Sequence, residues 1–253
     1  MILIKNSEQI ELIKKAAEIA ANTLSLLSSF IIPGKTGLEV DKLAEEYIRS
    51  MDGTAACKGY QDFPNSLCIS VNSGAVHCIP TNKPFLEGDV VKLDLVVDYN
   101  GLKADSAITC LIPPVKPEVR TLAETTYTAM LRGIEQAKEG NTVQSISQTI
   151  YDARGNCGVI REFTGHAIGR DIHESPSIPN VVIKEKNALI VAGMVLCIEP
   201  IFCTGDPAIY YRPKEWNTWM LDGGIVSHWE HTILVTNNVP EILTLRKEER
   251  YAS

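Results

Sequence analysis

The stretch Val90–Ile108, VVKLDLVVDYNGLKADSAI, carries acidic residues on both sides of the dipeptide Asn100-Gly101. Asn-Gly between two apolar runs is a strong signal for a two-residue β-hairpin turn. If these two residues form the turn, residue i pairs with residue 201 − i, and Asp105 lies opposite Val96, two positions from Asp94. Both carboxylates then project from the same face of the hairpin as diagonal neighbours, about 7–8 Å apart.

The residues around these two aspartates are leucine, valine and alanine, which is the composition of a buried strand. Burying two anions side by side costs several kcal/mol each unless cations or hydrogen-bond donors compensate. A solvated hairpin strand is the alternative interpretation, and the hairpin alone does not exclude it. The pair therefore indicates a metal site only if the chain supplies further ligand-type residues.

Composition is that of a globular protein. The 253 residues are 45% hydrophobic and 22% charged, and we expect a single domain over residues 1–253. No apolar run reaches eighteen residues, so we expect no membrane association. The net charge of −7, with no Lys/Arg run longer than two, argues against nucleic acid as the substrate.

The seven cysteines are scattered and include no Cys-x-x-Cys motif. Five of them lie in apolar, strand-like surroundings, which is typical of reduced, buried thiols rather than of a disulfide framework. The N-terminus lacks a small-residue cleavage site, so we expect no signal peptide. These features predict a cytoplasmic location.

Apolar periodicity predicts the same order of elements twice. The pattern predicts an amphipathic helix from Asn6 to Ser28, where Asn6 with Gln9 loosely resembles a capping box, and a second helix from Thr36, capped by Thr36-x-x-Glu39. Strands at 66–71, 89–97 and 102–111 follow these helices. Helices at 117–138 and 142–153 then precede strands at 159–164, 195–202, 216–221 and 225–235. This repetition predicts an internal pseudo-twofold relation, in which the hairpin ending in Asp105 faces the one carrying Glu199 and Glu230.

Three further segments supply residues that commonly bind metals. His166 and His173 share the glycine-containing loop GHAIGRDIHESP, whereas Glu199 in VLCIEPIF and Glu230 in SHWEHTILV are carboxylates within apolar runs. An acid in such a run is nearly always paired or coordinated, although a lone histidine is more often a core residue. Asp94, Asp105, Glu199 and Glu230 carry four negative charges, which two divalent cations would cancel, and His166 adds one imidazole.

These residues, in this order and within the words KLD, KAD, GHAIGRDIHE, CIEP and WEHT, resemble the type I methionine aminopeptidases. The resemblance covers nearly the whole chain, from GYQDFPNSLCISVN and VHCIP to EHT. It implies an α+β pita-bread fold, in which helices cover the outer face of a curved antiparallel sheet. It also implies metal-dependent removal of the N-terminal methionine from nascent proteins and peptides.

The resemblance makes Asp94 a ligand of one metal ion, makes His166 and Glu199 ligands of the other, and makes Asp105 and Glu230 bridge both. Glu199 would also carry a proton from water to the leaving amine. The cofactor would be two divalent ions, and manganese, iron, cobalt and zinc all suit these donors. The type II members of the family carry a helical insertion for which the stretch from His173 to Glu199 is too short.

His77 and His173 match the family's two non-ligand histidines, which contact the substrate and take part in catalysis. The pocket for the methionine side chain would be formed by Cys57, Tyr60, Phe63, Cys68 and Trp216. Thiols and aromatic rings suit a thioether independently of the resemblance. The expected partner is a peptide or nascent-protein N-terminus that begins with Met, the ribosome is a further candidate, and we expect a monomer.

The chain departs from the family pattern at several positions that are not ligands. The departures are Cys78, Ala104, Ala167, Asp171-Ile172 and His228. Ile172 replaces an aromatic residue of the pocket, which makes the preference for methionine less secure than the peptidase chemistry. His228 stands close to the site, where glutamine is usual.

Three other functions stay open at this stage. An X-Pro dipeptidase or creatinase-like hydrolase would share the fold, but those relatives generally carry an additional N-terminal domain. A binding module that has lost its metals would lack ligands that this chain retains. A cysteine hydrolase would use Cys78 with His77, but adjacent residues of a strand point to opposite faces.

Overall fold

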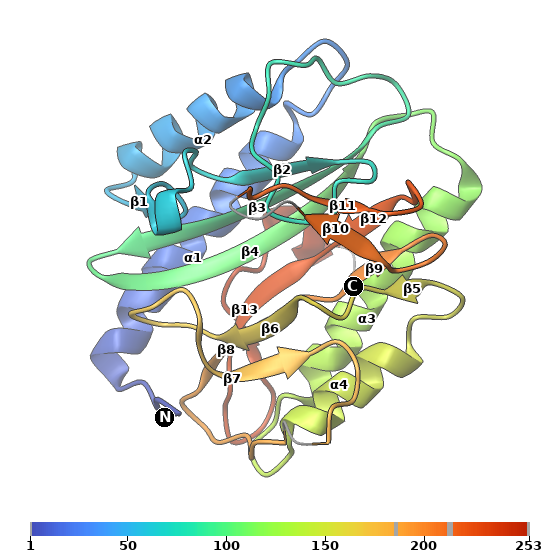
Figure 1. The fold of residues 1–253 in the computed structure, drawn as a ribbon. Coiled ribbons are helices and arrows are strands. Elements are labelled where there is room, and N and C mark those ends of the chain that lie inside the picture. Colours follow the sequence, from blue (N-terminus) through green and yellow to red (C-terminus); the bar gives the residue numbers. More distant parts are fainter. Residues whose placement is uncertain (1, 185–186, 212–214, 252–253) are drawn as a thin grey trace.

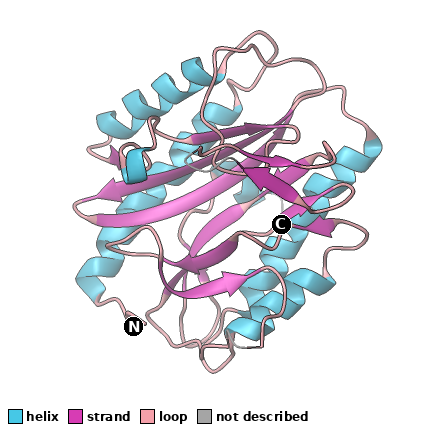
Figure 2. Cartoon of the chain, in the orientation of Figure 1, coloured by secondary structure: helices cyan, strands magenta, loops and turns pink. Residues whose placement is uncertain are grey.

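The computed structural model describes residues 2–184, 187–211 and 215–251. A curved antiparallel sheet forms the centre, and four α-helices of the described chain cover its outer face (Figures 1 and 2). In chain order, the α-helices and β-strands of the described residues are α1 (Ser7–Ser28), α2 (Gly37–Ser50), β1 (Thr54–Ala55), β2 (Cys68–Val71), β3 (Val90–Tyr99), β4 (Leu102–Leu111), α3 (Pro117–Gln136), α4 (Val143–Asp152), β5 (Gly158–Val159), β6 (Thr164–Ala167), β7 (Glu174–Pro179), β8 (Val195–Ile198), β9 (Ile201–Cys203), β10 (Ile209–Tyr211), β11 (Thr218–Met220), β12 (Val226–His228), β13 (Glu230–Leu234) and β14 (Glu241–Ile242).

The large sheet has the strand order β1-β3-β4-β13-β8-β6-β7, with β2 also pairing with β3 and β14 with β13. Strands β12, β9 and β5 form a separate three-stranded sheet, and β10 pairs with β11. Strand β13 therefore joins the two halves of the large sheet, because it lies between β4 from the first half and β8 from the second.

The helix starts agree with the capping predictions. The side chains of Asn6 and Gln9 bond to each other's backbone N–H groups at the start of α1, and Thr36 and Glu39 do the same at α2. Such reciprocal bonds satisfy N–H groups that the first helical turn leaves free. The third helix ends at Gln136, two residues before the predicted end at Lys138.

The central hairpin has the predicted register. Asp105 pairs with Val96, and Asp94 pairs with Ala107 across the β3–β4 ladder. Asn100 and Gly101 both have positive φ, as the two-residue turn requires. The two aspartates therefore lie on one face of the sheet, two rows of residues apart.

Several predicted strands are shorter or broken. The strand predicted at 159–164 is wrong, because β5 ends at Val159 and β6 starts at Thr164. The segment predicted as one loop for both histidines places His166 inside β6, and β7 begins directly after His173. This stretch is rich in glycine, proline and charge, so only its partner strands reveal its extended conformation.

Two longer predicted strands each divide between two sheets. The run 195–202 breaks at Glu199-Pro200, where proline cannot donate a ladder hydrogen bond, and continues as β9 in the small sheet. The run 225–235 divides at Trp229 into β12 and β13. The strand predicted at 216–221 is confirmed as the shorter β11.

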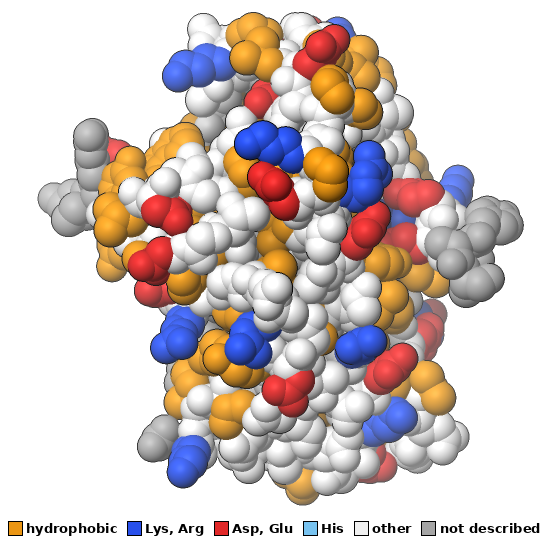
Figure 3. Space-filling view, turned by 90° about the vertical axis from the view of Figure 1, so that its right-hand side faces the viewer, with side chains coloured by type: hydrophobic (Ala, Val, Ile, Leu, Met, Phe, Trp, Pro, Cys, Tyr) orange, Lys and Arg blue, Asp and Glu red, His pale blue; other side chains and the backbone are white. Residues whose placement is uncertain are grey.

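The core consists of two main clusters, one under each helix pair. Helix α1 packs its apolar residues on β3 and β4, and α2 packs on α1 and β1. Helix α3 packs on β8, β9, β12 and β13, and α4 packs on α3 and β7. The order of two helices followed by strands thus occurs twice. None of the helices in the described part of the chain combines the length and apolar character of a membrane span. Figure 3 shows basic and acidic side chains interspersed over the face in view.

Candidate metal centre

The strand residues predicted as ligands share one face of the large sheet and lie in two rows that are two positions apart along each strand. In the first row, Ala107 of β4 lies between Asp94 of β3 and Glu230 of β13. In the second row, Asp105 of β4 lies beside Thr232 of β13, which in turn pairs with Cys197 of β8. Residues two positions apart on a strand share a face, so Asp105 projects from the same face as Asp94 and Glu230.

The other half of the sheet completes the arrangement. His166 of β6 pairs with Cys197, and Glu199 follows Cys197 by two residues. All five predicted ligands, Asp94, Asp105, His166, Glu199 and Glu230, line one cavity of about 70 Å³. Strands β3, β4, β6 and β13, together with the end of β8, thus bring together residues that are up to 136 positions apart in the sequence.

The imidazole of His166 is oriented toward the carboxylates. Its Nε2 lies 3.3 Å from Glu199 Oε1 and 4.0 Å from Asp105 Oδ2, and its Nδ1 lies 3.1 Å from the backbone oxygen of Ala167. If Nδ1 donates its proton to this carbonyl, Nε2 retains a lone pair directed into the cavity. This is the usual orientation of a metal-binding histidine.

The carboxylates are in an environment that disfavours their negative charges. Burial raises the pKa of Asp94 to about 6, although the charge of His166 partly opposes the shift. Burial raises the pKa values of Asp105, Glu199 and Glu230 well above their usual range, and the neighbouring carboxylates add to this effect. A group of buried acids needs positive charge nearby to remain ionised at neutral pH.

Two carboxylate oxygens of the site have no hydrogen-bond partner, which indicates what supplies this positive charge. Asp105 Oδ1 and Glu230 Oε1 are buried and have no hydrogen-bond partner, whereas buried polar atoms are normally paired. Ligand atoms of Asp105, His166, Cys197 and Glu230 lie within 4.8 Å of one another. Unpartnered carboxylate oxygens beside an oriented imidazole fit divalent metal ions.

Hydroxyl groups fix the backbone of the ligand strands. The Thr232 hydroxyl donates to the carbonyl of Asp105 and accepts from the Asp105 N–H. The Ser106 hydroxyl donates to the carbonyl of Glu230, and the buried guanidinium of Arg246 donates to Ser106. These bonds hold β4 against β13 at the centre of the site.

Cys197 and His228 belong to the surroundings of the site but were not predicted as part of the ligand set. Cys197 shares a face with Glu199 because they are two residues apart, and this parity is a signal that the sequence already contains. Burial raises the pKa of the Cys197 thiol well above its usual range, and the nearby negative charge of Glu230 raises it further. His228 lines the 70 Å³ cavity.

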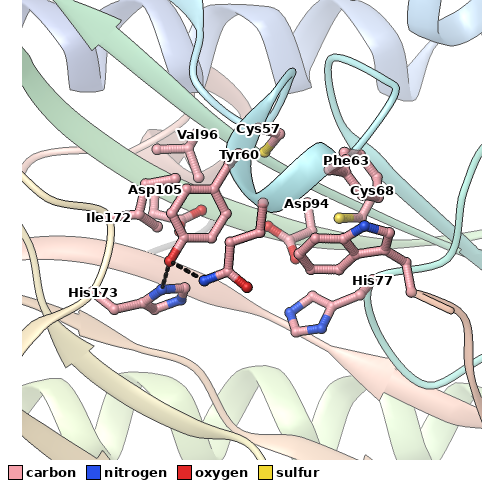
Figure 4. A pocket seen from close by; sticks show the side chains of 12 residues that line it. Cys57, Tyr60, Phe63, Cys68, His77, Asp94, Val96, Asp105, Ile172 and His173 are labelled. Atoms are coloured by element: carbon pink, nitrogen blue, oxygen red, sulfur yellow. Dashed lines mark hydrogen bonds between the residues drawn. The ribbon is translucent and has the colours of Figure 1, made fainter. Parts of the chain in front are cut away.

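A second pocket of about 230 Å³ opens beside the cavity (Figure 4). Asp94, Asp105, His77 and His173 line both spaces. The remaining lining residues are the predicted Cys57, Tyr60, Phe63, Cys68 and Trp216, together with Gln61, Val96 and Ile172. The pocket is therefore mostly apolar and ends at the carboxylates.

One wall of this pocket is organised by hydrogen bonds. The Tyr60 hydroxyl lies 3.1 Å from Nδ1 of His173, and the Gln61 side-chain amide donates to the same hydroxyl (Figure 4). Gln61 adopts a left-handed backbone conformation with φ 45°, which places it at the pocket. Gln61 was not among the predicted pocket residues, although it lies in the segment GYQDFPNSLCISVN between the predicted Tyr60 and Phe63.

His77 and Cys78 face different spaces, which disfavours the cysteine-hydrolase interpretation. The His77 ring packs edge-on against Phe163 and Trp216, and burial, with a smaller effect of His173, lowers its pKa to about 4. The Cys78 thiol instead lies near the backbone oxygens of Val76 and Thr218. The predicted reason was wrong, because these residues are not in a strand and His77 has a positive φ.

Comparisons with known proteins agree with this geometry. Residues 11–237 match the model of metallopeptidase family M24. The methionine aminopeptidase of Clostridium perfringens is 38% identical, covering 98% of this chain and 100% of the relative. The crystal structure of methionine aminopeptidase from Thermotoga maritima superimposes with a TM-score of 0.94 at 35% identity, covering 96% of this chain and 99% of that one.

A prolidase structure from Pyrococcus furiosus is less similar, with a TM-score of 0.76 and 26% identity. That match covers 96% of this chain but only 66% of the prolidase. The predicted α+β pita-bread architecture is confirmed by the methionine aminopeptidase structures.

Proposed function

Because the chain belongs to metallopeptidase family M24, we propose that it is a metal-dependent aminopeptidase that removes the N-terminal methionine from peptides and nascent proteins. The observation that carries this proposal is the position of the apolar pocket directly beside the carboxylate cavity. We further propose that residues 1–253 form one catalytic domain. The seven cysteines are all free, which suits the reducing cytoplasm.

The five residues around the cavity would hold two divalent ions. Asp94 would bind one ion, His166 and Glu199 the other, and Asp105 and Glu230 both, which accounts for the carboxylate oxygens that lack hydrogen bonds. When bound, such ions lower the pKa of water and polarise a carbonyl group. The residue types do not select among manganese, iron, cobalt and zinc.

The pocket would hold the side chain of the first residue. Cys57 and Cys68 supply sulfur atoms, and Phe63 and Trp216 pack with their rings edge-on, 5.2 Å apart. Sulfur and aromatic groups make favourable contacts with a thioether. Ile172 contributes an aliphatic wall, which leaves the pocket apolar although the usual aromatic residue is absent.

His173 would donate a hydrogen bond to the carbonyl oxygen of the scissile bond. The Gln61 amide donates to the Tyr60 oxygen, so the Tyr60 O–H proton is free to be donated to Nδ1 of His173. Nδ1 is then an acceptor, and the proton of the neutral ring resides on Nε2. Burial, with a smaller effect of His166, lowers the pKa of His173 to about 4, so the ring is neutral at pH 7.

Glu199 would accept the proton of the attacking water at a carboxylate oxygen and transfer it to the leaving amine. Glu199 lies beside His166 in the wall of the cavity, which would give its carboxylate access to both the attacking water and the leaving amine. His77, which lines both the pocket and the cavity, would position the substrate backbone. Glu199 and His77 are partly shielded from solvent, which strengthens their electrostatic effect.

The test combines metal analysis with a peptide panel. Protein purified without oxygen is analysed for its elements and then incubated with Met-Ala-Ser and with Ala-Pro. We expect about two divalent ions per chain, release of Met from Met-Ala-Ser, and loss of that activity after chelation. Hydrolysis of Ala-Pro alone would assign the prolidase reaction instead, and cleavage by metal-free protein would refute metal dependence.

A further inference from the structure

We propose that His228 is an additional metal ligand in this chain, so that the ion held by His166 and Glu199 is bound by two imidazoles. This inference rests on the proposed function, because it concerns the same ions. It goes beyond the five-ligand set, to which His228 does not belong. The ion that His228 would bind is a divalent cation that accepts an imidazole nitrogen as a ligand.

The two carboxylate oxygens of Glu199 each face a different imidazole. Nε2 of His166 lies 3.3 Å from Oε1, and Nε2 of His228 lies 3.8 Å from Oε2. Both rings line the cavity of about 70 Å³ that the five proposed ligands share. Glu199 is therefore flanked by two nitrogen atoms.

His228 Nε2 has an unsatisfied bonding position. The residue is 3% exposed, and its Nε2 is buried without a hydrogen-bond partner. The 3.8 Å separation from Glu199 is too long for a hydrogen bond. Two atoms that each lie about 2.1 Å from the same ion can be separated by up to about 4.2 Å, so one ion can contact both.

The backbone of His228 is held so that its side chain faces the cavity. The Thr109 hydroxyl donates to the carbonyl of His228 and accepts from its N–H. This repeats the arrangement by which Thr232 holds Asp105. The ring of Trp229, the next residue, packs instead against Tyr127 of α3 on the outer side of the sheet.

Cys197 is the other nearby donor, but its thiol already has a partner. Its Sγ lies 3.5 Å from the Thr232 hydroxyl. Among the described residues of this cavity, His228 is the histidine whose buried Nε2 has neither a hydrogen bond nor a proposed role. A second imidazole would shift the preference of the site toward cobalt, zinc or iron over manganese, because manganese favours oxygen ligands.

The experiment counts imidazole ligands in substrate-free protein. Full-length chain is treated with chelator, loaded fully with Co²⁺ and measured by X-ray absorption at the cobalt edge. We expect two coordinated imidazoles per chain in the wild type and one in His228→Gln. His166→Gln should also give one, whereas His77→Gln removes another imidazole that lines the cavity and should still give two.

Calorimetric titration supplies a second readout. We expect His228→Gln to weaken Co²⁺ binding by at least about tenfold and Mn²⁺ binding by less. One imidazole per chain in wild-type protein would overturn the inference without any variant, so a misfolded variant does not leave it undecided. The inference also fails if His228→Gln has the wild-type absorption spectrum. Wild-type protein that binds no Co²⁺ would instead refute the proposed function.

Discussion

Replacing His173 by alanine tests whether this residue acts on the substrate rather than on the metals. The ring lies at the junction of the pocket and the carboxylate cavity, and it is held by the Tyr60 hydroxyl at 3.1 Å. Removing one preorganised donor to a developing oxyanion lowers kcat by about 100- to 1000-fold, or about 2.7–4 kcal/mol. We expect a loss of this size in kcat for Met-Ala-Ser, with metal content unchanged.

Two companion variants separate the donor from the residue that orients it. Tyr60→Phe removes one neutral hydrogen bond, of about 0.5–1.5 kcal/mol, which corresponds to a decrease of about 2- to 12-fold. His173→Gln keeps a side-chain N–H donor and should retain more activity than His173→Ala. Steady-state kinetics and elemental analysis of the same preparations measure these effects.

The assignment has two ways to fail. Loss of a metal ion from His173→Ala would make this residue a ligand rather than a donor. A kcat within about threefold of wild type, with intact metal, would show that the imidazole does not stabilise the transition state. Circular dichroism on each variant checks that the fold is retained.

Further predictions concern the metals and the buried charges. Asp105→Ala should abolish activity together with at least one metal ion, as measured by elemental analysis, and an active, fully loaded variant would end the bridging assignment. Despite burial, bonds from His231 and the charge of Arg246 lower the pKa of Glu249 from 4.5 to about 2. Glu249→Gln should therefore reduce the unfolding free energy by about 3 kcal/mol at pH 7 and by about 1.4 kcal/mol at pH 3, because this stabilisation is lost as pH falls through 2; equal urea curves at pH 7 would contradict this. Burial lowers the pKa of Lys92 from 10.5 to about 7. The free-energy cost of burying its charged ammonium group on folding is therefore fully present below pH 7 and disappears toward pH 10.5. The effect of Lys92→Met on metal-free protein should be more stabilising at pH 6 than at pH 9 by about 2.7 kcal/mol, with the exposed Lys42→Met as the control.

Local signals predicted the parts of the fold that depend on neighbouring residues. The Asn100-Gly101 turn fixed the β3–β4 register, and with it the relative position of Asp94 and Asp105. The capping pairs at Asn6 and Thr36 located the helix starts. Each of these features is determined within a few residues, so tertiary packing does not override it.

Features that depend on strand pairing were less predictable. Strands β6 and β7 contain glycine and proline, and their extended conformation comes from pairing with each other and from the β6–β8 pairing. The approach of His228 to Glu199 requires the chain to leave one sheet at Pro200 and to change sheets again at Trp229. Gln61 reaches the pocket only through a left-handed turn residue. The periodicity of apolar residues does not predict any of these features.

The central position of β13 has a consequence for how the protein is made. The strand order places residues 230–234 between the two halves of the large sheet, although they are among the last described strands to leave the ribosome. Until they emerge, Asp94 and Asp105 have no neighbouring strand through which to meet His166. A partly synthesised copy therefore lacks the assembled centre, and an inactive interval during its own translation follows directly from the topology.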